Sequence, residues 1–137
     1  MSFDGILDQL HSFGSKVELM PPASGCPLDT PKPYGELLCK YFNGGELFIP
    51  GTQLYSAEML PAVNSKKEKD VLGIPGEIYV IGITNYGDPV CMESNAPYRV
   101  ILWDAEQRCP DDYYDSIDEL ILEEIECYEA YIGKGIK

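Results

Sequence analysis

The chain has 137 residues, of which 23 are acidic and 10 basic, so its formal net charge is −13 and its pI lies near 4.2. This length fits one domain with one core, because domains of roughly 100 to 150 residues are the commonest size. A hydrophobic content of 45% excludes a disordered acidic segment. The negative charge repels nucleic-acid phosphates and anionic lipids, so we expect neither as a direct partner and consider a cationic partner instead.

Cysteine and histidine usage narrows the possible chemistry. The cysteines lie at least 13 positions apart, which excludes the Cys-Xaa-Xaa-Cys spacing of zinc and redox sites and predicts reduced, mostly structural thiols. His11 is the only histidine, so Ser-His-Asp, Cys-His and multi-histidine metal chemistry would all have to use this one residue near the N-terminus. We therefore expect a non-catalytic protein without metal or cofactor. The five cysteines are Cys26, Cys39, Cys91, Cys109 and Cys127.

The N-terminal residues do not have the pattern of a targeting segment. Asp4 and Asp8 stand where a signal peptide needs a cationic region followed by an apolar one. The sequence also lacks an apolar run long enough to span a bilayer. We expect a cytoplasmic protein.

The first third of the chain predicts two helices joined by an irregular segment. Apolar residues at helical spacing predict a helix over about 2–14. Residues 20–33 hold five of the eleven prolines, which favour an irregular connection. A second helix begins at Pro33 and ends at Asn43-Gly44-Gly45, where glycine allows a left-handed stop.

Short elements are expected between residues 46 and 72. Capping-box spacing of Ser65 and Glu68 predicts a helix over 65–72, with Lys66, Lys67 and Lys69 on a solvated face. The segments before it are strand candidates at 46–49 and 53–55, a Pro50-Gly51 turn between them, and one helical turn at 56–60.

The second half predicts an antiparallel sheet and a long final helix. The segments 77–84, 89–93 and 98–103 have strand composition, and the turns between them are too short for anything but antiparallel pairing. A second capping box at Ser116 opens a helix with an apolar face up to Ile132. We expect a single α+β domain over residues 1–137, with a mostly antiparallel sheet covered by helices.

Three segments within residues 31–131 resemble the SUKH superfamily. The first is the helix from Pro33 through Leu37-Leu38 that leads into Asn43-Gly44-Gly45. The second is the strand ending in Ile81-Gly82, followed after a turn by Gly87-Asp88. The third is the strand ending in Trp103-Asp104, followed by a variable stretch and the helix opening Ser116-Ile117-Asp118-Glu119-Leu120.

The SUKH superfamily contains bacterial toxin-immunity proteins and relatives of a fungal cell-wall-synthesis regulator. The resemblance implies an α+β fold with a mostly antiparallel sheet and no catalytic activity. In bacteria it implies a protein that binds and neutralises a cognate toxin domain.

Acidic residues are concentrated near the C-terminus. Between Asp104 and Tyr131 there are eleven acidic residues and one base, Arg108. On the final helix Glu119, Glu123 and Glu126 follow one another at helical spacing, and each like-charge pair costs about 0.2 to 0.5 kcal/mol. The pattern is typical either of a solvated helix face in an acidic protein or of a surface that meets a basic partner, and both interpretations stay open.

Tyr113 and Tyr114 stand between carboxylates in a segment that we expect to be a loop. Tyrosine is enriched in binding hot spots; the alternative is that one of the two packs into the core and the other lies on the surface. The carboxylate pairs do not have the spacing of a calcium loop, and such pairs arise by chance in so acidic a chain, so neither a calcium site nor a glycosidase is favoured.

We predict an immunity-type protein that occludes a cationic toxin domain through an acidic surface. The alternative is a non-catalytic regulatory scaffold like the eukaryotic relatives. A third hypothesis, a small-molecule cleft near Asp88 and Trp103, has little residue support. The predicted partner-binding residues are Asp104, Asp111, Asp112, Tyr113, Tyr114, Asp115, Glu119, Glu123 and Glu126.

Overall fold

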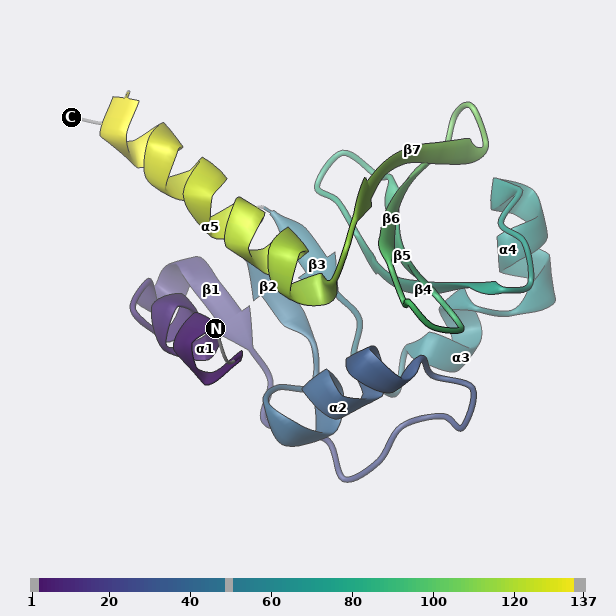
Figure 1. The fold of residues 1–137 in the computed structure, drawn as a ribbon, viewed down its shortest axis with the longest axis horizontal. Coiled ribbons are helices and arrows are strands. Elements are labelled where there is room, and N and C mark those ends of the chain that lie inside the picture. Colours follow the sequence, from purple (N-terminus) through teal and green to yellow (C-terminus); the bar gives the residue numbers. More distant parts are fainter. Residues whose placement is uncertain (1–2, 49–50, 135–137) are drawn as a thin grey trace.

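Each strand of the chain pairs with the next, so the sheet is a continuous antiparallel meander in the order β1 to β7 (Figure 1). The computed structural model describes residues 3–48 and 51–134, with side chains up to Ile132. The strands are β1 (Val17–Leu19), β2 (Gly45–Leu47), β3 (Thr52–Leu54), β4 (Ile78–Ile83), β5 (Pro89–Glu93), β6 (Val100–Asp104) and β7 (Cys109–Tyr114).

Five α-helices lie within the described ranges, together with a short 3-10 helix at Gly14–Lys16. The predicted capping box at Ser65 is formed, because the Ser65 hydroxyl accepts a hydrogen bond from the Glu68 N–H at 3.3 Å. Gly73 ends the same helix in the left-handed conformation. The helices are α1 (Phe3–His11), α2 (Lys32–Lys40), α3 (Leu60–Val63), α4 (Lys66–Leu72) and α5 (Ile117–Lys134).

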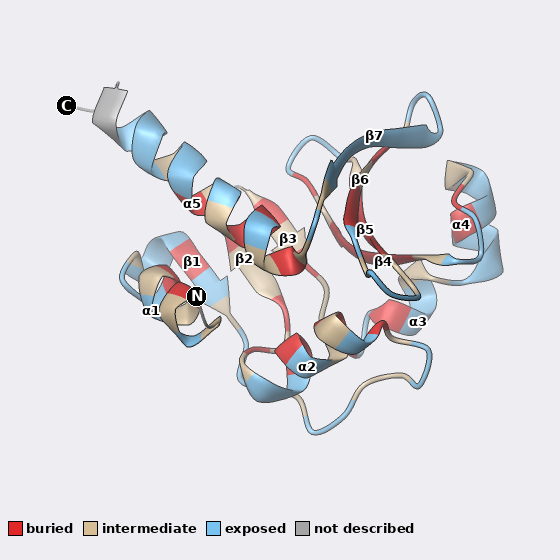
Figure 2. Ribbon diagram, in the orientation of Figure 1, coloured by how far each residue is buried: buried red, intermediate tan, exposed pale blue. Residues whose placement is uncertain are grey.

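The central strands are buried on both faces, and alternate residues belong to two separate cores. Residues Tyr79 and Ile81 of β4 join the large core with α1, α2 and α5, whereas Val80 between them joins a smaller cluster beside α3 and α4. In β6 the same alternation sends Val100 to the large core and Trp103 to the small one. Helices therefore cover both faces of the middle of the sheet, while β7 at its edge stays exposed (Figure 2).

The main role of the Asn43-Gly44-Gly45 segment is to hold neighbouring parts of the chain together, and ending helix α2 is the smaller part of what it does. The Asn43 side chain accepts a hydrogen bond from the Ala57 N–H at 2.8 Å and donates to Glu58 at 3.0 Å. A Cβ atom at Gly45 would lie 2.0 Å from the Glu18 carbonyl oxygen. Glycine is needed there because two backbones approach closely.

The predicted fold class is confirmed: the described residues form a single α+β domain with an antiparallel sheet. Strands β1 and β7 were not predicted. A hydrogen-bonded turn over 57–59 lies within the expected turn at 56–60, and it leads into helix α3, which begins at Leu60 and was not predicted. The helix start at Ser2 and the strand and turn residues Ile49 and Pro50 lie outside the described residues.

The prediction that Lys69 lies on a solvated face is wrong. Lys69 is 8% exposed, and its Nζ donates to the Gly76 carbonyl oxygen at 3.2 Å. Burial lowers the pKa of this amine, because removal from water disfavours its charged form. The long aliphatic part of the side chain supports the small core, since α4 must cover β4 to β6 there.

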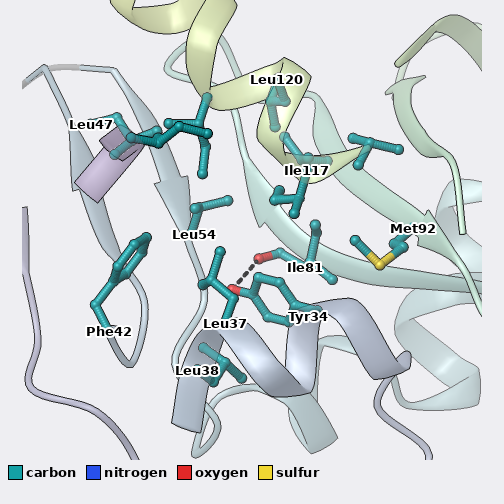
Figure 3. Packing of buried hydrophobic residues seen from close by; sticks show 14 of the residues in the cluster. Tyr34, Leu37, Leu38, Phe42, Leu47, Leu54, Ile81, Met92, Ile117 and Leu120 are labelled. Atoms are coloured by element: carbon teal, nitrogen blue, oxygen red, sulfur yellow. Dashed lines mark hydrogen bonds between the residues drawn. The ribbon is translucent and has the colours of Figure 1, made fainter. Parts of the chain in front are cut away.

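Tyr34 fixes α2 to the centre of the sheet (Figure 3). Its side chain is fully buried, and its hydroxyl lies 2.5 Å from the Tyr55 carbonyl oxygen and 3.1 Å from that of Ile81. The Ile81 carbonyl oxygen also accepts a hydrogen bond from the Tyr55 N–H at 2.8 Å. The Tyr55 carbonyl oxygen therefore depends more on the Tyr34 hydroxyl than the Ile81 oxygen does. One buried hydroxyl thus satisfies the end of β3 where the chain leaves the sheet.

Replacement of Tyr34 by phenylalanine tests this connection. We expect Y34F to lower the free energy of unfolding by about 1 to 2 kcal/mol, because a buried carbonyl oxygen loses its partner. Urea denaturation followed by tryptophan fluorescence measures the change. Y86F, at a residue that is 71% exposed, is the control and should change stability by less than about 0.5 kcal/mol. Equal effects of the two substitutions would show that the Tyr34 hydroxyl contributes nothing.

Candidate functional site

A large cleft lies along α5 and has a volume of about 710 Å³. We call it the α5 groove. This volume falls within the range of roughly 300 to 1,000 Å³ that ligand sites occupy. Its lining combines one face of α5 with residues from the short 3-10 helix, from β2, β3, β6 and β7, and from the turn between β4 and β5. The lining residues are Lys16, Leu47, Phe48, Gly51, Thr52, Thr84, Asn85, Tyr86, Leu102, Tyr114, Leu120, Glu123, Glu124, Cys127, Tyr128 and Tyr131.

One end of the groove is aromatic. The ring of Phe48, just after β2, stacks on Tyr128 of α5 with 4.5 Å between centroids and 15° between planes. Phe13 meets both rings edge-on, at 4.9 Å from Phe48 and 5.7 Å from Tyr128. Tyr131 extends this end, 6.4 Å from Tyr128 and 60% exposed. Such aromatic pairs contribute about 0.5 to 1.5 kcal/mol beyond the area they bury.

The backbone of Phe48 is strained where it forms this wall. Its φ is +57°, a left-handed value that bulky residues rarely adopt. Conformations of this kind cost on the order of 1 to 3 kcal/mol and persist only where the surroundings impose them. Here the two ring contacts supply the compensation.

The other end of the groove is acidic. Tyr114, the last residue of β7, donates a hydrogen bond from its hydroxyl to the Glu123 carboxylate on α5. The pKa of Tyr114 is raised, first by burial, then by this bond, and then by the negative charges of Glu123, Asp112 and Glu124. Strand β7 and helix α5 therefore bring their carboxylates to the same place.

Tyr86 closes the acidic end from the turn between β4 and β5. Burial raises its pKa first, followed by the charge of Asp88 and then those of Asp111 and Glu124. Its ring stays 71% exposed, so it stands at the mouth of the groove and not on its floor. We call Asp111, Asp112, Glu123 and Glu124 the acidic margin.

The arrangement favours binding over chemistry. The Cys127 thiol lies in the groove, where burial and the neighbouring charges of Glu123, Glu124 and Glu126 raise its pKa and so disfavour the thiolate. In the described part of the chain, no three His, Cys, Asp or Glu side chains are arranged to hold a metal ion. A groove with aromatic groups at one end and carboxylates at the other can hold a cation beside an apolar group.

The segment from Asp111 to Tyr114 is a strand, not the predicted loop. It pairs with β6 as the edge of the sheet, and Asp111 is the extra residue of a bulge between Pro110 and Asp112. The alternation of the strand separates the two tyrosines. Tyr114 turns toward α5, whereas Tyr113 is paired with Ile101, whose side chain belongs to the core on the opposite face.

Tyr113 is occupied by an internal contact. The Arg99 guanidinium lies 4.8 Å from the centroid of its ring. Arg99 is held there by Glu93, whose carboxylate accepts bonds from the Arg99 backbone at 2.7 Å and from its side chain at 3.0 and 2.8 Å. One face of the predicted binding residue is therefore already covered by a cation of this chain.

The other predicted partner-binding acids lie outside the α5 groove. Asp104 caps the turn from β6 to β7, accepting the N–H groups of Glu106 at 2.9 Å and Gln107 at 2.8 Å. Glu119 accepts the Asp115 N–H at 3.0 Å and belongs to the capping arrangement at the start of α5. Glu126 is exposed on α5 and is not among the lining residues.

Asp88 and Trp103 do not form a cleft together. Trp103 is 3% exposed in the small core, and its indole N–H donates to the Leu72 carbonyl oxygen at 2.8 Å. Asp88 accepts the Ala105 N–H at 3.1 Å and so joins two turns of the sheet. A cleft of about 190 Å³ lies beside them, lined among others by Leu72, Gly87 and Pro89, but neither Asp88 nor Trp103 is among its lining residues. The predicted small-molecule site therefore stays a prediction.

Sequence reasoning missed most of the groove. Glu124, Cys127 and Tyr131 lie at helical spacing from Leu120 and Glu123. This second face of α5 could have been recognised from the sequence. Phe48 and Tyr86 come from separate turns, and nothing in their local sequence connects them to α5.

No family model matches the chain, and comparisons with curated proteins and with solved structures give no match either. The resemblance to the SUKH superfamily, which was drawn from residues 31–131, therefore stays a prediction. None of the helices in the described ranges is both long and apolar enough to cross a membrane.

The Glu93–Arg99 pair gives a prediction about pH. Hydrogen bonds from Arg99 lower the pKa of Glu93, so the pair stabilises the fold above the ordinary glutamate pKa and loses its contribution as the pH falls through the lowered value. We expect E93Q to cost about 0.5 to 1 kcal/mol at pH 7, since the pair is partly exposed, and much less near pH 3. Urea denaturation at both pH values measures this. A cost that is equal at pH 3 and pH 7, or matched by E77Q at an exposed acid, would contradict it.

The bond between Tyr114 and Glu123 gives a second prediction. We expect Y114F to destabilise the fold by about 1 kcal/mol, because a charge-assisted hydrogen bond between β7 and α5 is lost. Hydrogen exchange should also become faster in β7. Y113F is the matched control, because the Tyr113 hydroxyl has no hydrogen-bond partner among the described residues. No difference between the two variants would mean that the bond does not hold the strand.

Proposed function

We infer that the protein is a stoichiometric protein-binding module of the immunity type, which neutralises a cationic toxin domain by covering its functional surface. The observation that carries this proposal is the acidic margin: Asp111 and Asp112 shortly precede Tyr114 on the exposed edge strand, and the Tyr114 hydroxyl binds Glu123 of α5, which Glu124 follows in the groove lining. None of these carboxylates forms an ion pair with a described residue; the ion pairs found are Lys66–Asp70 and Glu93–Arg99.

The energetics of α5 support a partner of opposite charge. Like charges at helical spacing destabilise a helix by a few tenths of a kcal/mol per pair. Glu119 and Glu123 of α5 are such a pair. A basic surface would remove these costs on binding, and the margin would accelerate encounter by long-range attraction.

The resemblance to SUKH immunity proteins supports the same function. In this proposal no bond is made or broken, because the acidic margin and the exposed Tyr86 only exclude substrate from the partner's basic site. The partner would be a toxin domain encoded beside this chain, and a nuclease is the class whose substrate-binding surface is most often basic.

Charge reversal in the margin tests the proposal. The purified toxin domain from the neighbouring gene is mixed with the wild-type protein or with D111K/D112K, and inhibition of the toxin and association rates are measured at low and high salt. We expect the variant to associate at least about tenfold more slowly at low salt, with the difference shrinking at high salt, because steering is screened.

D8K/E36K is the matched control. It makes the same change in net charge at exposed residues of α1 and α2. The control should keep nearly wild-type association. Absence of binding to any protein encoded beside the chain, or binding that responds equally to both variants and not to salt, would show that the proposal is wrong.

A further inference from the structure

We propose that the α5 groove takes an extended segment of the partner in which a basic residue lies four positions from a large apolar one. This inference rests on the proposed function and specifies how the cationic partner is held. It follows from the two chemically different ends of the groove, which are formed by different residues and different contacts.

The acidic end fits a guanidinium or ammonium group. Glu123 is held in place by the Tyr114 hydroxyl, so one carboxylate is oriented before binding. Glu124 and Tyr86 line the same groove. A cation there would meet two carboxylates and the faces of two tyrosine rings, which together replace its hydration.

The aromatic end fits an apolar side chain. Phe48 and Tyr128 form a stacked wall, and Tyr131 stands beside it, 60% exposed. Lys16 lies at this end, because Val17 pairs with Leu47 and Phe48 follows directly. A second basic residue of the partner would be repelled by Lys16, so the groove distinguishes the two positions.

The distance between the ends fixes the spacing in the partner. Glu123 and Tyr131 are eight residues apart on one helix, which places them about 12 Å apart along the axis. An extended chain rises about 3.3 Å per residue, so about four residues cover this distance, and residues four apart point to the same side. The groove volume of about 710 Å³ accommodates two large side chains and the backbone between them.

Short peptides test the proposal without the natural partner. The probe is the blocked pentapeptide Arg-Ser-Thr-Ser-Leu, titrated into the ¹⁵N-labelled protein while amide shifts are recorded. We expect shift changes at groove residues from β2, from the turn between β4 and β5, and from β7 and α5. Replacement of Arg by citrulline, which removes the charge and keeps the shape, should weaken binding about tenfold or more, and replacement of Leu by Ser should also weaken it.

Protein variants locate the two contacts. E123Q/E124Q should weaken the Arg peptide at least about tenfold and leave the citrulline peptide unchanged. Y131S should weaken the Leu peptide and leave the Ser peptide unchanged. The matched control is E126Q/E129Q, which removes the same charge from exposed positions of α5 outside the groove lining and should bind like wild type.

Three results would overturn the inference. They are absence of shift changes up to several millimolar probe, equal weakening by E126Q/E129Q and E123Q/E124Q, and equal affinity for the Leu and Ser peptides. Any of them can occur while D111K/D112K still disrupts toxin binding, in which case the partner meets the acidic margin but does not enter the groove. If the peptide binds as expected and no toxin domain does, the groove stands and the immunity function fails.

Discussion

The stacking of Phe48 on Tyr128 is the contact on which the α5 groove depends. Helix α5 is fixed near its start by Ile117, Leu120 and Ile121, which are buried in the large core. Ile125 is also buried and α5 contacts α1, but of residues 126–132 only Tyr128 is not exposed. The aromatic contact is therefore what attaches these later turns to the end of β2. The helix therefore spans the strand ends and encloses a cleft instead of closing onto them.

The same arrangement explains why charge is tolerated on α5. A helix that packed flat on the sheet would bury Glu123 and Glu124, at a cost of several kcal/mol for each unpaired charge. Raised on its aromatic anchor, the helix keeps both carboxylates in contact with water in the groove. Tyr114 supplies one hydrogen bond to Glu123, and this links the edge strand to the helix at the point where no apolar contact is available. The same position of α5 thus leaves the cleft open and keeps the charges of Glu123 and Glu124 hydrated.

The sequence predicted the elements whose own residues determine them. Strands β4 to β6 have strong strand composition, and the capping boxes at Ser65 and Ser116 mark real helix starts. Strand β7 was missed because Cys-Pro-Asp-Asp-Tyr-Tyr has weak strand propensity, and it is extended only because β6 offers a ladder to pair with. Lys69 was misplaced because its charge suggested solvent while its aliphatic stem was needed in the small core. The concentration of acids was visible in the sequence, but the groove was not, since its two ends meet only through contacts between residues far apart in the chain.

Strand β7 also has a bearing on the chain's behaviour in concentrated solution. An unpaired strand edge invites pairing with another copy and hence aggregation. Here Pro110 removes one backbone donor, the bulge at Asp111 breaks the regular edge, and two carboxylates point outward from it. A second copy, itself carrying a charge of −13, is repelled from this edge, whereas a basic partner is attracted to it. The edge strand therefore favours pairing with a basic chain over pairing with a second copy of the protein.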